Sequence, residues 1–122
     1  MRYMLLVHHD EAAFMKLSEA TRQGMLDESI ELTHELHATR QYLSASPLQS
    51  AATAAIVRVR DGKSTVIDGP FIETKEQLAG YFLIEARDLN DAIAIASRVP
   101  GARIGTVEVR PLREVTGLPD NR

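Results

Sequence analysis

Cysteine is absent from this sequence of 122 residues, and its absence excludes several kinds of chemistry. Without a thiol the chain forms no disulfide, has no cysteine nucleophile and offers no thiolate to a metal ion. This composition fits a reducing compartment, so we expect the protein in the cytoplasm.

Long apolar runs and clusters of basic residues are also missing. No run approaches the roughly 18–20 apolar residues that span a bilayer. The apolar part of the N-terminus is too short for a signal peptide and lacks a cleavage site. The formal net charge is −3, and Lys and Arg are scattered along the chain. We therefore expect neither a membrane nor a nucleic acid as a partner.

The motifs of several enzyme and cofactor classes are not found. There is no glycine-rich phosphate loop, and Ser44 and Ser46 lie in no nucleophile-elbow pattern. The spacings Glu31-x-x-His34 and His34-x-x-His37 would suit metal ligands on one helix face. A di-iron bundle needs a second such pair on another long helix, and the sequence has none. We interpret these residues as a solvated helix face and expect no bound metal and no cofactor.

The composition that remains is that of an ordinary globular domain. Hydrophobic residues make up 44% and charged residues 25% of the chain. The length is enough for one domain with one hydrophobic core. We expect this domain at residues 1–115 and a polar tail at residues 116–122.

Two strands are predicted to be apolar on both faces. In residues 3–8, Tyr3, Leu5 and Val7 alternate with apolar neighbours, and residues 81–86 show the same pattern. A strand of this kind lies at the centre of a sheet that is covered above and below.

Two helices are predicted from their caps and apolar stripes. Ser18 is a suitable N-cap for a long helix at residues 18–39, and Asp88 is suitable for a second helix that ends at Pro100-Gly101. Gly24 weakens the first half of the long helix by up to about 1 kcal/mol.

A hairpin is predicted around Asp61-Gly62, a two-residue turn that suits type I′. Residues 54–60 and 63–68 flank this turn. The implied register pairs Arg60 with Lys63, Arg58 with Thr65, Val57 with Val66 and Ile56 with Ile67. A weak edge strand at residues 42–45 and a last strand at residues 106–110 complete the order β-α-β-β-β-β-α-β.

This order is of the α+β class, and two helices cover only one face of its antiparallel sheet. The other apolar face needs a cover, and a second copy of the same sheet supplies one. We therefore predict a homodimer with sheets packed face to face, as in a ferredoxin-like, dimeric α+β barrel.

The sequence also resembles a known family. The motifs that carry the resemblance are Asp68-Gly-Pro-Phe71, Glu73-Thr-Lys-Glu76, Gly80-Tyr81, Arg2-Tyr-Met-Leu-Leu6, Pro100-Gly-Ala-Arg103 and Val107-Glu-Val-Arg-Pro111. Together they resemble the DGPF proteins of the YCII-related superfamily, from residue 1 to about residue 113. The resemblance implies a dimeric ferredoxin-like α+β barrel and no generally established activity. DGPF proteins are often encoded beside extracytoplasmic-function sigma factors, which suggests a regulatory link.

One mechanism proposed for the wider superfamily is not expected here. Some of its members carry a His on the long helix and an Asp near the end of that helix, proposed as a catalytic pair. The corresponding positions fall at about Ser29 and Ala38, so this chain has neither residue.

The densest group of polar residues begins at the last residue of the predicted hairpin. Its members are Asp68, Glu73, Lys75 and Glu76. A strand ending at Asp68 must leave the sheet at Gly69-Pro70, and we expect the next strand from about Gly80. In a functional interpretation, Asp68 and Glu73 line a pocket beside the barrel mouth, and Lys75 orients an anionic ligand or lowers the pKa of a carboxylate.

The alternative for this group is structural. Asp68 then forms an Asx-type turn by accepting from backbone N–H groups of the loop, and Lys75 pairs with a neighbouring acid. Phe71 is interpreted as an apolar anchor of the loop rather than a stacking platform. The candidate ligand-binding residues are Asp68, Phe71, Glu73 and Lys75.

His8 and His9 are predicted on opposite sides of the first strand's end. The one that faces the sheet interior could act as an acid–base residue near neutral pH. The alternative is a histidine that only forms hydrogen bonds at the strand end. His8 and Asp68 are the candidate catalytic residues, and whether the protein is an enzyme is left open.

Our first hypothesis is a dimer that binds a small polar or anionic molecule. The cleft would lie between the first strand's end, the loop at residues 68–75 and the partner subunit. A different hypothesis is a non-enzymatic regulatory or protein-interaction module linked to a sigma factor. A purely structural dimer is a third.

Overall fold

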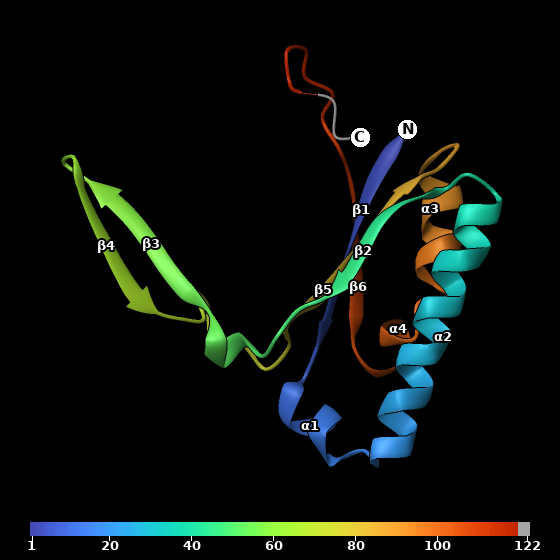
Figure 1. Ribbon diagram of the computed structural model, residues 1–122, viewed down its shortest axis with the longest axis horizontal. Coiled ribbons are helices and arrows are strands. Elements are labelled where there is room, and N and C mark those ends of the chain that lie inside the picture. Colours follow the sequence, from blue (N-terminus) through green and yellow to red (C-terminus); the bar gives the residue numbers. More distant parts are fainter. Residues whose placement is uncertain (120–122) are drawn as a thin grey trace.

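The computed structural model describes residues 1–119 and has the α+β architecture predicted from the sequence. Residues 120–122, the end of the expected polar tail, lie outside the described residues. Two antiparallel sheets and four α-helices make up the described part of the chain (Figure 1). The ferredoxin-like topology and the dimer stay predictions.

The main sheet has four antiparallel strands in the order β2-β5-β1-β6. Its strands are β1 (Arg2–His9), β2 (Tyr42–Pro47), β5 (Gln77–Glu85) and β6 (Thr106–Pro111). The two strands that are apolar on both faces, β1 and β5, occupy the centre, as their sequences predicted. The weak strand β2 lies at one edge, also as predicted.

The two longer helices begin at the predicted caps. In α2 (Glu19–Ala38) the Ser18 side chain accepts a hydrogen bond from the Thr21 amide at 3.1 Å. In α3 (Leu89–Ala96) Asp88 accepts one from the Asp91 amide at 2.9 Å. Both caps satisfy amides that the first turn of a helix leaves without a partner.

Two short helices were not predicted. One is α1 (Glu11–Lys16), which Asp10 caps by accepting a hydrogen bond from the Ala13 amide. The other is α4 (Gly101–Ile104), so Pro100-Gly101 begins a helix, whereas we expected these residues to end α3. A Cβ atom at Gly101 would lie 2.4 Å from Val7 Cγ1, so glycine lets α4 approach β1 closely.

The helices α2 and α3 lie on the same side of the main sheet (Figure 1). The core between them and the sheet contains Tyr3, Leu5, Leu32, Leu36, Phe82, Ile84, Ala92 and Ile95. The opposite face of the two central strands carries Met4, Leu6, Tyr81 and Leu83, which are only half-buried. We call these four residues the open face.

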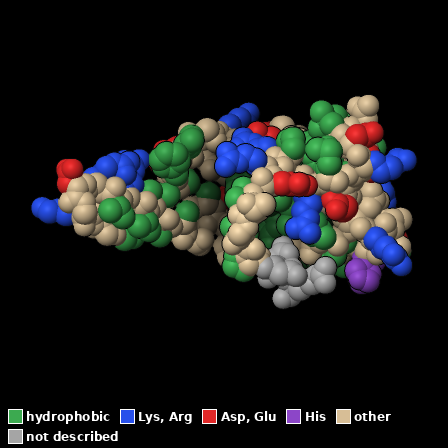
Figure 2. Space-filling model, turned by 90° about the horizontal axis from the view of Figure 1, so that it is seen from above, with side chains coloured by type: hydrophobic (Ala, Val, Ile, Leu, Met, Phe, Trp, Pro, Cys, Tyr) green, Lys and Arg blue, Asp and Glu red, His purple; other side chains and the backbone are tan. Residues whose placement is uncertain are grey.

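The strands β3 (Ala55–Arg60) and β4 (Lys63–Asp68) form a separate two-stranded sheet that extends away from the main body (Figures 1 and 2). The register agrees with the prediction pair by pair. Asp61 and Gly62 have φ angles of 52° and 73°, as a type I′ turn requires. The separation of this hairpin from the main sheet was not predicted. We call residues 55–68 the arm.

The chain leaves the arm at a close backbone contact. The Gly69 amide donates a hydrogen bond to the Ala54 carbonyl oxygen at 2.7 Å. A Cβ atom at Gly69 would lie 2.7 Å from Ala54 Cβ. Glycine is therefore needed here for close approach, and not for a positive φ angle, which Gly69 does not have.

The strand β5 resumes earlier than expected, at Gln77 instead of about Gly80. Its first residues pair with the end of β1, His9 with Gln77 and His8 with Leu78, across a register shift after Val7. Because the pairing continues past this register shift, β5 begins closer to the loop at residues 68–75 than the sequence pattern predicted.

Candidate functional site

A pocket of about 300 Å³ lies between the first half of α2 and the main sheet. Its walls are mostly apolar, with Met25, Leu26 and Ile30 from α2 and Val7 and Phe82 from the sheet. The volume is at the lower end of the roughly 300–1,000 Å³ typical of small-molecule sites. We call this cavity the α2 pocket.

His9, at the end of β1, is part of the wall of the α2 pocket. Its ring lies against Phe14 of α1, with 4.6 Å between the ring centroids. Burial lowers the pKa of His9, and the nearby carboxylates of Glu11, Asp10 and Glu76 raise this pKa by a smaller amount. The imidazole is thus mainly neutral at pH 7, with one nitrogen as a donor and the other as an acceptor.

The structure separates His9 from His8. The register shift after Val7 lies at the end of β1, and of the two histidines only His9 lines the α2 pocket. The sequence indicated that one of the two would face the interior. It did not show which one, because the irregular pairing changes the position of both residues.

Arg22 of α2 also lines the pocket and brings a positive charge to its wall. Its Nη1 atom donates hydrogen bonds to the carbonyl oxygens of Met15 and Leu17, at 3.0 and 2.8 Å. These bonds fix the guanidinium beside the connection between α1 and α2. Sequence reasoning missed Arg22, although its spacing of seven to Ser29 places both on one helix face.

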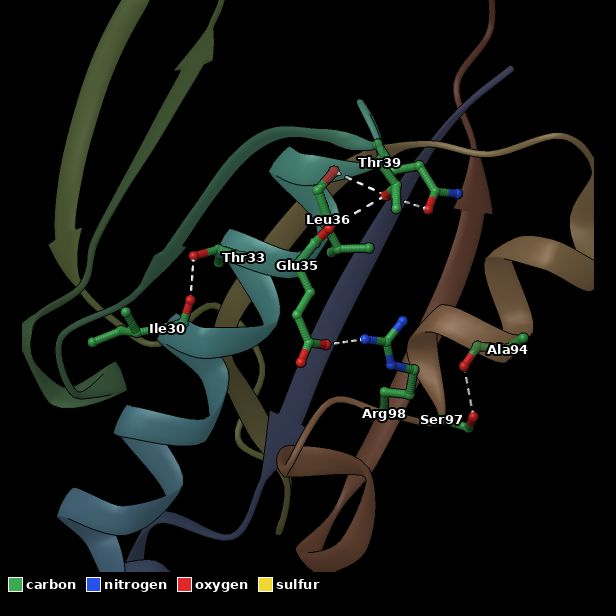
Figure 3. A network of polar contacts seen from close by, with 9 residues as sticks. Ile30, Thr33, Glu35, Leu36, Thr39, Ala94, Ser97 and Arg98 are labelled. Carbon is green, nitrogen blue, oxygen red and sulfur yellow. Dashed lines mark hydrogen bonds and ion pairs between the residues drawn. The ribbon is translucent and has the colours of Figure 1, made fainter.

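Two hydroxyl groups of α2 also line the pocket. Ser29 donates to the Met25 carbonyl oxygen at 3.0 Å, and Thr33 donates to the Ile30 carbonyl oxygen at 2.5 Å (Figure 3). Because their protons are used within the helix, these oxygens can still accept hydrogen bonds. Ser29 also marks the approximate position at which some members of the wider superfamily carry a helix histidine.

The predicted ligand-binding residues lie elsewhere. Asp68, Phe71, Glu73 and Lys75 are exposed, and none of them lines the α2 pocket. Phe71 is 65% exposed, with the guanidinium of Arg58 5.6 Å from its ring centroid. None of these four residues is therefore part of the wall that contains His9 at the end of β1. Ligand binding by these residues, and catalysis by His8 and Asp68, stay predictions.

The neighbouring Glu76 acts on a residue of the pocket wall. Its Oε1 atom accepts a hydrogen bond from the Thr106 hydroxyl at 2.9 Å, and its charge acts on His9. Within residues 1–119, no group of three or more His, Asp or Glu side chains is placed to hold a metal ion. None of the helices in this part of the chain has the length and apolar character that crossing a membrane requires.

Comparison with known proteins gives a family and one relative. The model of the YCII-related domain family matches residues 1–116 of the chain. An uncharacterized protein of Rhizobium meliloti (strain 1021) is 35% identical over 121 residues, which cover 92% of each chain. These matches confirm the YCII-related resemblance read from the sequence motifs.

Proposed function

This chain belongs to the YCII-related domain family, and we propose that it binds a small molecule in the α2 pocket, in contact with His9. The observation that supports this most directly is the partly buried His9 imidazole in an otherwise mainly apolar wall. Apolar pockets with a few polar groups are typical of small-molecule sites. A neutral imidazole could hold a polar group of the ligand or move a proton to or from it.

We propose that the protein works as a homodimer. The open face supports this, because its four residues form a strip across the two central strands that is only half-buried in the single chain. A second copy of the sheet would cover this strip with the same four side chains of the partner. In such a dimer the loop at residues 68–75 of one subunit could join the first strand's end of the other. That is how the predicted Asp68, Phe71, Glu73 and Lys75 would contribute to a cleft.

A second candidate function is a protein-interaction module. The arm favours it, because Val57, Val59 and Val66 share one face of the hairpin and are 60–66% exposed. Exposed apolar surface of this kind marks interaction sites. A link to a sigma factor is implied only by the DGPF resemblance, and a cytoplasmic location is a prediction from the absence of cysteine.

A thermal-shift screen against a metabolite panel tests the pocket. The wild type is compared with His9→Gln and with His8→Gln, a matched control in the adjacent residue outside the pocket wall. We expect a compound that raises the melting temperature of the wild type and of His8→Gln, and raises it less or not at all for His9→Gln. Loss of the shift in Asp68→Asn, with His9→Gln unaffected, would instead place the ligand at the loop.

A further inference from the structure

Arg22 is a cation whose charge is not balanced inside the pocket that it lines. Among residues 1–119, no Asp or Glu side chain is part of the α2 pocket wall, and Arg22 forms no ion pair. Its hydrogen bonds go to two carbonyl oxygens, which carry no net charge.

The other arginines in residues 1–119 are exposed; four of them pair with a carboxylate, and five form no ion pair, namely Arg2, Arg40, Arg58, Arg60 and Arg113. Arg87, Arg98, Arg103 and Arg110 each pair with a carboxylate of the same chain. These pairs are on the surface, where they are exposed to water. Arg22, in contrast, is only partly exposed and sits beside apolar side chains. Such a position makes an external anion a favourable partner, because water screens the charge less there.

The three acids whose charges act on His9 have hydrogen-bond partners of their own. Asp10 caps α1 through the Ala13 amide, and Glu76 accepts the Thr106 hydroxyl. Glu11 accepts hydrogen bonds from the chain near residue 51. Each carboxylate is therefore held outside the pocket wall by its own contacts.

The hydrogen-bonding capacity of Arg22 leaves room for a ligand. The two bonds to Met15 and Leu17 both come from Nη1. The Nε and Nη2 donors have no hydrogen-bond acceptor within residues 1–119. A guanidinium presents these donors side by side, in the geometry that suits the two oxygens of a carboxylate.

From these contacts we propose that the ligand of the α2 pocket is a small amphipathic carboxylic acid. Its carboxylate binds Arg22, and its apolar body lies among Met25, Leu26, Ile30 and Phe82. This inference rests on the proposed function of the α2 pocket and names its ligand class.

The test uses three probes that share one alkyl chain and differ only in the head group: octanoate, octanol and octylammonium. Methyl-labelled methionine supplies the NMR signal, because Met25 lines the pocket and Met15 is exposed outside its wall. We expect the Met25 methyl signal to shift on titration while the Met15 signal moves little. Octanoate should bind about tenfold or more tightly than octanol, and octylammonium most weakly.

Two variants of Arg22 and one control variant show whether Arg22 causes the preference for octanoate. Arg22→Gln should reduce octanoate affinity to that of octanol and leave octanol affinity unchanged, which also shows that the pocket is intact. Arg22→Lys keeps the charge and should retain part of the preference for octanoate. Arg98→Gln removes a surface arginine that is paired with Glu35 outside the pocket, and it should not change the order of the probes.

Two results would overturn the inference in different ways. If octanol or octylammonium binds the wild type as tightly as octanoate, the acid is the wrong ligand class, while the pocket remains a binding site. If no probe shifts the Met25 signal in the wild type or in any variant, the pocket proposal itself is wrong, and the ligand class fails with it.

Discussion

The Glu11 carboxylate accepts a hydrogen bond from the Ala51 amide at 2.7 Å, and this contact ties the end of β1 to the base of the arm. The second carboxylate oxygen accepts the Ser50 hydroxyl at 2.8 Å. Ala51 begins the short 3-10 helix η1 (Ala51–Thr53), which leads into β3. The contact therefore connects the start of α1, which follows His9 closely in the chain, with the segment that leads into the arm.

Glu11→Gln should destabilise the protein at neutral pH, by about 1 kcal/mol for an accessible charge-assisted contact. The Ala51 amide, followed by the Ser50 hydroxyl, holds the pKa of Glu11 below its usual value of 4.5. Because the folded pKa is the lower one, the carboxylate stabilises the fold above pH 4.5. This contribution is lost as the pH falls from 4.5 through the folded value.

Denaturant unfolding of the wild type and of Glu11→Gln over a pH series measures this effect. The difference between the two should be largest near pH 7 and shrink below pH 4.5. If the difference in unfolding free energy stays constant over the whole pH series, the charge of Glu11 does not stabilise its contact with the base of the arm.

The same substitution at two glycines should have opposite effects. Gly69→Ala would bring a methyl group 2.7 Å from Ala54 Cβ and 3.1 Å from the Ala54 oxygen, so we expect a loss of about 1–3 kcal/mol. Gly24→Ala places its methyl group in open space on α2 and should stabilise the fold by up to about 1 kcal/mol. Thermal or denaturant unfolding gives both values. Equal stability of Gly69→Ala and the wild type would show that the arm base shifts without cost.

The elements with local signals could be predicted from the sequence. The turn Asp61-Gly62 determines the register of the hairpin, and the caps Ser18 and Asp88 determine where α2 and α3 begin. These signals depend on residues that are neighbours in the chain, so they can be read without the fold.

The features that depend on distant contacts could not be predicted. The assignment of His9 to the pocket depends on irregular pairing between β1 and β5. The place of Arg22 depends on how α2 packs over the sheet, and the motif at residues 68–75 gave no sign that its polar side chains are exposed. In each case the sequence shows which residue is present, and the tertiary structure determines which groups its side chain contacts.

Light scattering combined with size exclusion tests the dimer. We expect the wild type to be a dimer and Leu6→Asp to dissociate it, because a charge would be buried between two open faces. Val59→Asp introduces the same charge on the exposed valine face of the arm. It should weaken the dimer less if sheet faces form the interface. Dissociation by Val59→Asp alone would place the interface on the arm.

His9 should titrate at a lower pH than a histidine in an unfolded chain. Burial lowers the pKa of His9 below 6.5, so the unfolded chain binds a proton in a pH range where the folded protein does not. The stability contribution of the neutral ring is therefore complete above pH 6.5. It is lost as the pH falls from 6.5 through the folded pKa.

Two variants should move the His9 pKa in opposite directions, which separates burial from charge. Phe14→Ala removes the ring that packs on His9 and admits water, so the pKa should rise toward 6.5. Glu76→Gln removes a negative charge that favours the imidazolium, so the pKa should fall further. NMR titration of the His9 ring, assigned with His9→Gln, measures both shifts. A rise in Glu76→Gln would contradict this account of the charges, and an unchanged pKa in Phe14→Ala would mean that the ring contact does not shield His9 from water.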